Sequence, residues 1–226
     1  MPPTLAFDVY GTLIDTHGLI PLLGEMAGEE TAPVLSRIWR EKQLEYSFRR
    51  ALARDYVTFA TCTRQALDYA CATLGVRLTP AERDSLLERY RTLPAFPEVP
   101  GALARLQDSG ARLYAFSNGT REAVEQLLRA AGIRDAFLDV VSVDAVSSFK
   151  PDPAVYAHFL AQAGARADRT WLVSGNPFDV LGADHAGWHT VWVQRDAAQV
   201  FDPWGHEPEQ VVSDLNGLTR LATTWG

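Results

Sequence analysis

Asp8 is the first residue of the chain whose position suggests chemistry. It follows the apolar residues 5–7 and precedes a turn that contains Gly11. Apolar runs of this kind are typical of buried parallel strands. Ligands of open α/β sheets bind just beyond the carboxyl ends of the strands, so a carboxylate here is placed to act on a ligand. An aspartate in this position is also a common helix or turn cap, and Asp8 alone fits either role.

Polar residues follow three further apolar runs in a similar way. They are Ser117 and Asn118 after residues 111–116, Lys150 after residues 140–143 and a short loop, and Ser174, Asn176 and Asp179 after residues 170–173. Singly, such residues are helix caps or solvated charges. Because the carboxyl ends of parallel strands share one edge of a sheet, we expect all of these groups to meet in one cleft. Polar groups at four strand ends at once are much harder to explain by capping alone.

The elements that position these residues alternate between strand and helix after residue 100. Strands are expected at 111–116, 140–143, 170–173 and 190–193, with helices between them. Residues 5–8 supply one more strand. This alternation predicts an α/β fold with a parallel, doubly wound sheet.

The segment from residue 13 to about residue 92 has a helical pattern instead. Apolar periodicity predicts helices at 34–52 and 58–75, and the Thr79-Pro80-Ala81-Glu82 sequence is a capping box that begins a third. We therefore expect a Rossmann-like core of residues 1–14 and 97–226. An all-helical cap of residues 15–96 is inserted after the first strand.

Composition excludes several classes of partner. The chain has 226 residues and a formal net charge of -7, so it lacks the basic excess that neutralises nucleic-acid phosphates. No apolar run approaches the roughly 20 residues that span a bilayer, and no signal peptide is recognisable. Cys62 and Cys71 would lie about 13 Å apart along one helix, too far for a disulfide. We expect a cytoplasmic protein that binds neither nucleic acid nor membranes.

The motifs at the strand ends resemble those of the haloacid dehalogenase superfamily. They are DVYGTL at 8–13, SNG at 117–119, the Lys150-Pro151 pair, and the set Ser174, Asn176 and Asp179. Phosphatases of this superfamily carry a second aspartate where this chain has Tyr10, and an acidic magnesium ligand where it has Gly175. Both groups serve phosphoryl transfer. The segment WREKQLEY at 39–46 is similar to the cap of L-2-haloacid dehalogenases. The resemblance implies such an enzyme, with no metal or other cofactor.

The same resemblance implies hydrolysis of L-2-haloalkanoic acids to D-2-hydroxy acids. Asp8 would attack C2 with inversion, expel halide and form an ester that water then hydrolyses. Asp179, supported by Ser174 and Asn176, would activate the water. The implied catalytic residues are Asp8, Thr12, Arg40, Ser117, Lys150, Tyr156, Ser174, Asn176 and Asp179. The implied substrate contacts are Tyr10, Glu41, Leu44, Phe59, Ser117, Asn118 and Phe178, with Arg40 and Asn118 holding the halide.

Two alternatives remain open on the residues alone. One is a magnesium-dependent small-molecule phosphatase of the same fold, and the other is a non-catalytic interaction protein that kept the fold. Gly175 replaces a serine that is frequent in relatives, so looser hydrogen bonding around Asn176 is expected. The histidines at 17, 158, 185, 189 and 206 are expected to be structural or surface residues. The resemblance also implies a homodimer.

Overall fold

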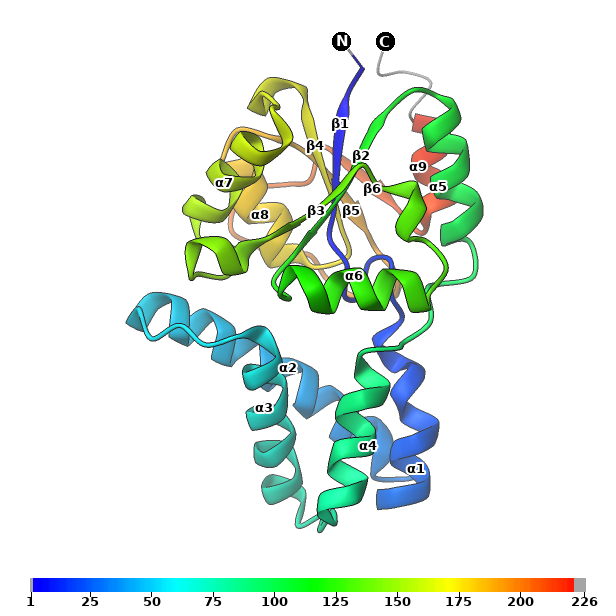
Figure 1. Cartoon of the computed structure of the whole chain (residues 1–226), viewed down its shortest axis with the longest axis vertical. Helices are drawn as coiled ribbons and strands as arrows, with labels where there is room; N and C mark the ends of the chain where they lie inside the picture. The colour runs from blue at the N-terminus through cyan, green and yellow to red at the C-terminus, as the bar shows by residue number, and fades with distance from the viewer. Residues whose placement is uncertain (1, 222–226) are drawn as a thin grey trace.

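A six-stranded parallel sheet forms the centre of the fold. The computed structural model describes residues 2–221 and orders the strands β3-β2-β1-β4-β5-β6 (Figure 1). The strands are β1 (Thr4–Phe7), β2 (Arg112–Ser117), β3 (Asp139–Ser142), β4 (Thr170–Ser174), β5 (His189–Val193) and β6 (Gln210–Val212). Every neighbouring pair is parallel, which confirms the predicted α/β fold.

The first strand of the chain lies in the middle of this sheet. Leu5 of β1 is paired with Leu113 of β2 on one side and with Trp171 of β4 on the other. All residues of β1 are buried, which explains their almost continuous apolar character. The amide of Asp8 donates to the carbonyl oxygen of Val173 at 3.0 Å and continues the β1–β4 pairing. Asp8 is therefore fixed at the middle of the carboxyl edge.

β6 is the one strand of the sheet that the sequence analysis did not predict. It has three residues, and among them only Val212 is buried. A run this short gives no periodicity from which a strand can be recognised.

Helices cover both faces of the sheet. α7 (Pro153–Ala163) and α8 (Pro177–His185) pack together on one side, whereas α5 (Val99–Asp108) and α9 (Leu215–Leu221) pack together on the other (Figure 1). α6 (Arg121–Ala130) connects β2 to β3. Three short 3-10 helices complete this part: Arg134–Ala136, Val143–Val146 and Ala167–Arg169. No helix within residues 2–221 combines the length and apolar character needed to span a bilayer.

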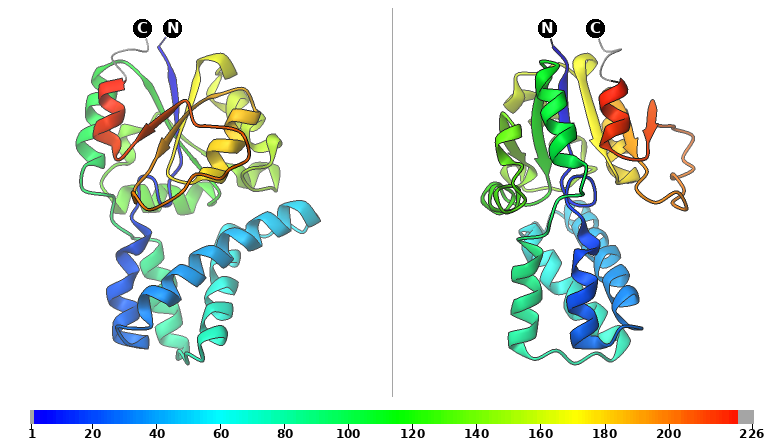
Figure 2. Two further views of the ribbon diagram at one scale, coloured as in Figure 1. Left: turned by 180° about the vertical axis from the view of Figure 1, so that it is seen from behind. Right: turned by 90° about the vertical axis from the view of Figure 1, so that its right-hand side faces the viewer.

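The helices between β1 and α5 form a separate group beyond the carboxyl edge of the sheet (Figures 1 and 2). They are a 3-10 helix (Thr16–Leu19), α1 (Ile20–Ala27), α2 (Ala32–Ala53), α3 (Phe59–Leu74) and α4 (Pro80–Tyr90). The predicted capping box begins α4, since the Thr79 amide donates to Glu82 Oε2 at 2.7 Å and the Glu82 amide donates to Thr79 Oγ1 at 3.2 Å. We call this group the insert.

The two chain crossings between the insert and the sheet lie side by side. Ile14 and Ala95 form an antiparallel bridge there. Arg195, in the segment after β5, donates to the Thr12 carbonyl oxygen and to Glu98 Oε1, each at 2.5 Å. Three distant parts of the sequence are thus joined beside the turn that follows Asp8.

Candidate active site

The side chain of Asp8 is only 7% exposed at the carboxyl edge of the sheet. Its Oδ2 accepts hydrogen bonds from Thr12 Oγ1 and Asn176 Nδ2, both at 2.7 Å. Its Oδ1 accepts one from Lys150 Nζ at 3.2 Å. Thr12 belongs to the turn after β1, whereas Lys150 and Asn176 come from the loops after β3 and β4. Three loops therefore converge on one carboxylate.

A tight turn after Asp8 brings Thr12 against the loop after β4. Gly11 has a φ of +82°, a conformation that side chains disfavour. Thr12 Oγ1 donates to Asp8 and accepts from the Gly175 amide at 2.8 Å. A Cβ at position 175 would lie 2.5 Å from the Gly11 carbonyl oxygen. The two loops meet backbone to backbone, and only glycine at position 175 permits this approach.

Asn176 is held by several hydrogen bonds at the end of this loop. Its Nδ2 donates to Asp8 Oδ2 and to the Tyr10 carbonyl oxygen at 3.1 Å, while its Oδ1 accepts from Arg40 Nη2 at 3.3 Å. Its amide donates to Ser174 Oγ at 3.1 Å. The expectation of loose hydrogen bonding around Asn176 is therefore wrong, because the close approach at Gly175 delivers Asn176 to Asp8.

Lys150 is a buried cation between two carboxylates. The residue is 1% exposed. Its Nζ donates to Asp8 Oδ1 at 3.2 Å, and to Asp179 Oδ2 and the Phe116 carbonyl oxygen at 2.8 Å each. These contacts use all three donors of the ammonium group. Its charge offsets the desolvation of both carboxylates, which would be costly to bury unpaired.

Asp179 is completely buried on the first turn of α8. Its Oδ2 contacts Lys150, and its Oδ1 accepts from the Tyr156 hydroxyl at 2.8 Å. Burial raises the pKa of Asp179, an effect that Lys150 opposes and the charge of Asp8 reinforces. The expected support from Ser174 and Asn176 is wrong for their side chains, because the Ser174 hydroxyl accepts from the Asn176 amide and the Asn176 side chain reaches Asp8. Asn176 contacts Asp179 only through the backbone, where its carbonyl oxygen accepts from the Asp179 amide at 3.1 Å.

Gly182, which the sequence analysis did not single out, makes room for Tyr156. A Cβ on Gly182 would overlap the Tyr156 hydroxyl and lie 2.7 Å from the Tyr156 Cζ. Tyr156 itself is fully buried, and burial raises the pKa of its phenol well above the usual value. The neutral hydroxyl therefore remains a donor to Asp179.

The residues around Asp8 do not fit the magnesium ion of the superfamily's phosphatases. Magnesium requires several oxygen ligands in octahedral geometry. The Lys150 ammonium group already bridges the carboxylates of Asp8 and Asp179. Position 175 has no room for a carboxylate, and position 10 carries a phenol that stacks on Tyr90. The side chains present support chemistry without a metal.

Arg40 reaches the Asp8 cluster from α2 of the insert. Its Nη2 donates to the Tyr10 carbonyl oxygen at 3.2 Å and to Asn176 Oδ1 at 3.3 Å. Its Nη1 donates to Gln43 Oε1 at 2.7 Å, and Gln43 also accepts from the Tyr90 hydroxyl at 3.0 Å. Gln43 is 1% exposed and orients Arg40. The sequence analysis missed it, because a glutamine among charged helix residues gives no sign of burial.

Ser117 is the last residue of β2, and Asn118 follows it. Asn118 Oδ1 accepts from the Lys150 amide at 2.9 Å, and Ser117 Oγ accepts from the Gly119 amide at 3.2 Å. Both residues are buried. Within residues 2–221, neither the side-chain Nδ2 of Asn118 nor the hydroxyl hydrogen of Ser117 has a hydrogen-bond partner.

The aromatic residues of the predicted substrate site form two groups. The Tyr10 ring stacks on Tyr90 at 5.5 Å between centroids and packs against Phe59 at 5.7 Å. Phe178 packs edge-on against Phe48 of α2 at 4.9 Å. Burial raises the pKa of the Tyr10 phenol, so this side chain is neutral and contributes apolar surface. Both the sheet region and the insert thus contribute aromatic rings to the predicted substrate site.

The two remaining predicted substrate contacts lie on α2. Leu44 is half-buried, whereas Glu41 is exposed and pairs with Arg37 at 3.1 Å. The Glu41 carboxylate therefore pairs with an exposed arginine, although the residue also lines the cavity that Arg40 lines.

Two cavities open between the insert and the carboxyl edge of the sheet. One of about 750 Å³ is lined in part by Arg40, Asn176 and Arg195, and one of about 610 Å³ in part by Tyr10 and Phe59. Both border residues that contact Asp8 or its turn.

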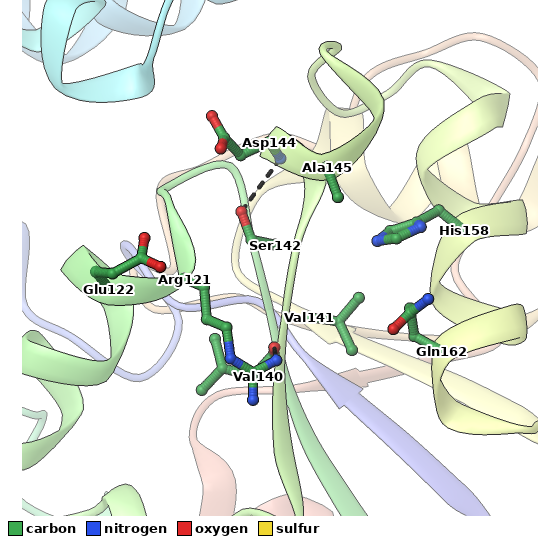
Figure 3. Close-up of a pocket in the computed structure, with 9 residues that line it drawn as sticks. All are labelled: Arg121, Glu122, Val140, Val141, Ser142, Asp144, Ala145, His158 and Gln162. Atoms are coloured by element: carbon green, nitrogen blue, oxygen red, sulfur yellow. Dashed lines mark hydrogen bonds between the residues drawn. The ribbon is translucent and has the colours of Figure 1, made fainter.

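A third cavity lies apart from this cluster, at the edge strand β3 (Figure 3). It has a volume of about 230 Å³, and its lining includes Arg121, Ser142 and His158. None of the predicted site residues lines it. It is not part of the candidate active site.

Comparison with known proteins agrees with this geometry. The family model of haloacid dehalogenase-like hydrolases matches residues 2–187. The (S)-2-haloacid dehalogenase of Pseudomonas sp. (strain YL) is 37% identical over 97% of this chain and 94% of its own length. Haloacetate dehalogenase H-2 of Moraxella sp. (strain B) is 34% identical, with 96% of each chain covered.

A solved structure leads to the same family. The L-2-haloacid dehalogenase of Xanthobacter autotrophicus, with chloropropionic acid covalently bound, has a TM-score of 0.92 and 29% identity, and 99% of each chain is covered. Sequence, fold and the arrangement around Asp8 therefore agree. This chain belongs to the haloacid dehalogenase-like hydrolases.

Proposed function

We propose that this protein hydrolyses (S)-2-haloalkanoic acids to (R)-2-hydroxy acids through an ester on Asp8. The observation that carries the proposal is the buried Asp8 carboxylate, whose Oδ2 is held by two donors and whose Oδ1 is held only by Lys150. The full-length similarity to (S)-2-haloacid dehalogenases supports the substrate class.

In the first step, Asp8 Oδ1 attacks C2 of the substrate from the side opposite the halogen. An oxygen lone pair forms the new C–O bond, and the electrons of the carbon–halogen bond leave with the halide. Oδ1 is the more available oxygen, because its single hydrogen bond of 3.2 Å is longer than the two that hold Oδ2. A carboxylate with little solvent to displace is a stronger nucleophile than one in water.

The departing halide and the substrate carboxylate both need donors. Arg40 supplies a fixed positive charge, which stabilises the halide more as its charge develops. The side-chain Nδ2 of Asn118 donates a hydrogen bond to the same halide. The Ser117 hydroxyl and the amides at the start of the following loop hold the substrate carboxylate. Tyr10, Phe59, Leu44 and Phe178 surround the alkyl group.

In the second step, water attacks the Asp8 Cγ of the ester. Negative charge develops on Oδ2, where the Thr12 and Asn176 donors already lie at 2.7 Å, as an oxyanion hole requires. Asp179 accepts a proton from the water, a role that suits a carboxyl whose pKa burial raises. This proton passes to the departing alkoxide. The second proton is released as the Asp8 carboxylate reforms.

The two steps together fix the stereochemistry. Backside attack inverts C2 once, and hydrolysis at Cγ leaves C2 untouched. An (S)-2-haloacid therefore gives an (R)-2-hydroxy acid.

Halide release from each enantiomer of 2-chloropropionate tests this function. With EDTA present, we expect chloride from the S form alone and (R)-lactate as the product. Asp8→Asn should abolish release without changing the melting temperature by more than about 2 °C. Magnesium-dependent release of phosphate from p-nitrophenyl phosphate, with no chloride release, would instead identify a phosphatase.

A single turnover in ¹⁸O-labelled water tests the ester. With enzyme in excess, the first label should enter the Asp8 carboxylate, detected by mass spectrometry of the peptide that contains it. Label that appears directly in the hydroxy acid would mean that water attacks C2 and that no ester forms.

We further propose that residues 15–96 act as a cap over a core of residues 1–14 and 97–226. The Ile14–Ala95 bridge lies at these boundaries, and Arg40 is the charged group that the insert adds to the Asp8 cluster. On the basis of the resemblance and the composition, we also propose a homodimer in the cytoplasm. Light scattering of the purified protein tests the dimer.

A further inference from the structure

Three potential metal-binding side chains meet at the far end of α8 from Asp179. Asp184 and His185 lie in the last turn of this helix, and His206 lies in the segment between β5 and β6. Figure 2 shows this segment curving past α8. None of the three belongs to the Asp8 cluster, and the sequence analysis expected both histidines to be structural or surface residues.

The potential ligand atoms of this triad are close together. One ligand atom from each residue lies within 4.8 Å of the other two. Asp184 Oδ2 and His206 Nδ1 are 2.8 Å apart, and the imidazole rings of His185 and His206 have centroids 4.5 Å apart. A zinc ion with bonds of about 2.0–2.2 Å places neighbouring ligand atoms roughly 3.3 Å apart in tetrahedral geometry. Side-chain rotations must shorten the separations of up to 4.8 Å to close the triad around an ion.

The tautomer of His185 is already suited to a metal. Its Nδ1 lies 2.7 Å from the Leu181 carbonyl oxygen, a contact in which the nitrogen must donate. The Nε2 lone pair is therefore free. Metal-bound histidines almost always donate their other ring N–H to such a carbonyl or to a carboxylate. The contact fixes both the tautomer and the orientation of the ring.

We propose that Asp184, His185 and His206 bind one first-row divalent transition metal ion, zinc being the reference case. Two imidazoles and one carboxylate favour zinc, copper or nickel over magnesium, which prefers oxygen ligands. The carboxyl end of a helix, where the triad lies, also favours a cation. The exposed position of the histidines leaves a fourth site for water.

Metal binding would strengthen the connection between α8 and the segment between β5 and β6, to which the hydrogen bond between Asp184 and His206 contributes little. Asp184 and His206 form a solvent-accessible pair, 32% and 46% exposed. Such pairs contribute little to stability. An ion held by both residues and by His185 would tie the β5–β6 segment to α8, and the folded state would gain stability with the concentration of free metal.

Zinc binding by untagged protein, first dialysed against EDTA, tests the proposal. Isothermal titration with zinc chloride should give one ion per chain, and the melting temperature should rise at saturating zinc. His185→Gln and His206→Gln should each weaken binding more than about tenfold, because even an indirect partner of a metal ligand contributes about 10–100-fold to affinity. Magnesium chloride in place of zinc should give no comparable binding.

His189→Gln is the matched control. His189 also pairs with a carboxylate, Glu209, at 2.9 Å, but it is not part of the triad. Its replacement should leave zinc affinity within twofold of the original. Melting curves without zinc verify that each variant is folded. Absence of stoichiometric zinc binding in the original protein, or equal affinity in His206→Gln, would overturn the proposal.

Discussion

Replacement of Gly182 by alanine should displace Tyr156 and disable Asp179 although neither of these residues is itself substituted. The new Cβ would overlap the Tyr156 hydroxyl and lie 2.8 Å from the Pro151 Cβ. Tyr156 is fully buried and has no open space into which it can withdraw. Its hydrogen bond to Asp179 Oδ1 must therefore lengthen or break.

The magnitude follows from two opposing effects. Overpacking of a core costs about 1–3 kcal/mol, and this contact belongs at the upper end of that range. Alanine in place of glycine returns up to about 1 kcal/mol of helix propensity. We expect a net loss of about 2 kcal/mol, or roughly 4–8 °C in melting temperature for a chain of this size. A lost hydrogen bond to a carboxylate, worth about 1.5–3 kcal/mol, should lower kcat by roughly tenfold or more.

Thermal unfolding and steady-state chloride release measure the two effects. Gly101→Ala is the matched control, because a Cβ on this helical glycine would meet only the Arg105 side chain at 3.4 Å. It should be neutral or stabilising. Tyr156→Phe removes the clashing hydroxyl, so Gly182→Ala should cost less in that background. A Gly182→Ala variant with unchanged melting temperature and kcat would refute the reasoning.

Further predictions concern the other charged groups. Arg40→Lys should lower kcat/KM about 10²–10³-fold with a change in stability below about 1 kcal/mol, because a single ammonium group cannot reproduce the fork in which Nη1 contacts Gln43 while Nη2 contacts Tyr10 and Asn176. Equal kcat/KM would exclude Arg40 from the halide site. Lys150→Met should abolish chloride release and destabilise the fold by about 3–5 kcal/mol, since two buried carboxylates lose their cation. The loss of unfolding free energy in Lys150→Met should be smaller at pH 5 than at pH 8, because protonation of Asp8 or Asp179 relieves the repulsion between the two carboxylates. Urea unfolding at both pH values measures this difference. In the proposed mechanism Asp179 is the base and must be deprotonated, so its raised pKa should place the acid limb of kcat above the range of an ordinary carboxyl. Tyr156→Phe should move this limb to still higher pH, because the Tyr156 hydrogen bond lowers the pKa of Asp179.

The sequence was sufficient to predict which strand ends meet. Asp8 and Lys150 follow apolar runs, and parallel strands place both at one edge whatever the details of the loops. The motifs at the strand ends and in the cap also indicated the family. These features depend on hydrophobic periodicity and on short motifs, which can be read from a single sequence without knowledge of tertiary contacts.

The partners within the site could not be predicted in the same way. Asn176 and Ser174 were assigned to Asp179, yet Asn176 bonds to Asp8 because the contact between Gly175 and Gly11 brings it there. That contact joins loops more than 160 residues apart, as the bond between the Gly175 amide and Thr12 shows. Gly182 was missed for a related reason, since it acts through Tyr156, which belongs to another helix. Gln43 was missed because its burial depends on Thr63 and Tyr90 of other helices, which its neighbours in sequence do not reveal.

The central place of β1 has a consequence for how the protein is made. This strand is synthesised first, but its neighbours β2 and β4 begin only at Arg112 and Thr170. At about 5–20 residues per second, the ribosome needs roughly 10–30 s to advance from β1 to the end of β4. During that time the apolar residues of β1 lack both partners, while the local contacts of the insert can form. Folding of the sheet therefore waits for the second half of the chain, and Asp8, although it is translated before the loops that hold it, is among the last residues to reach its final surroundings.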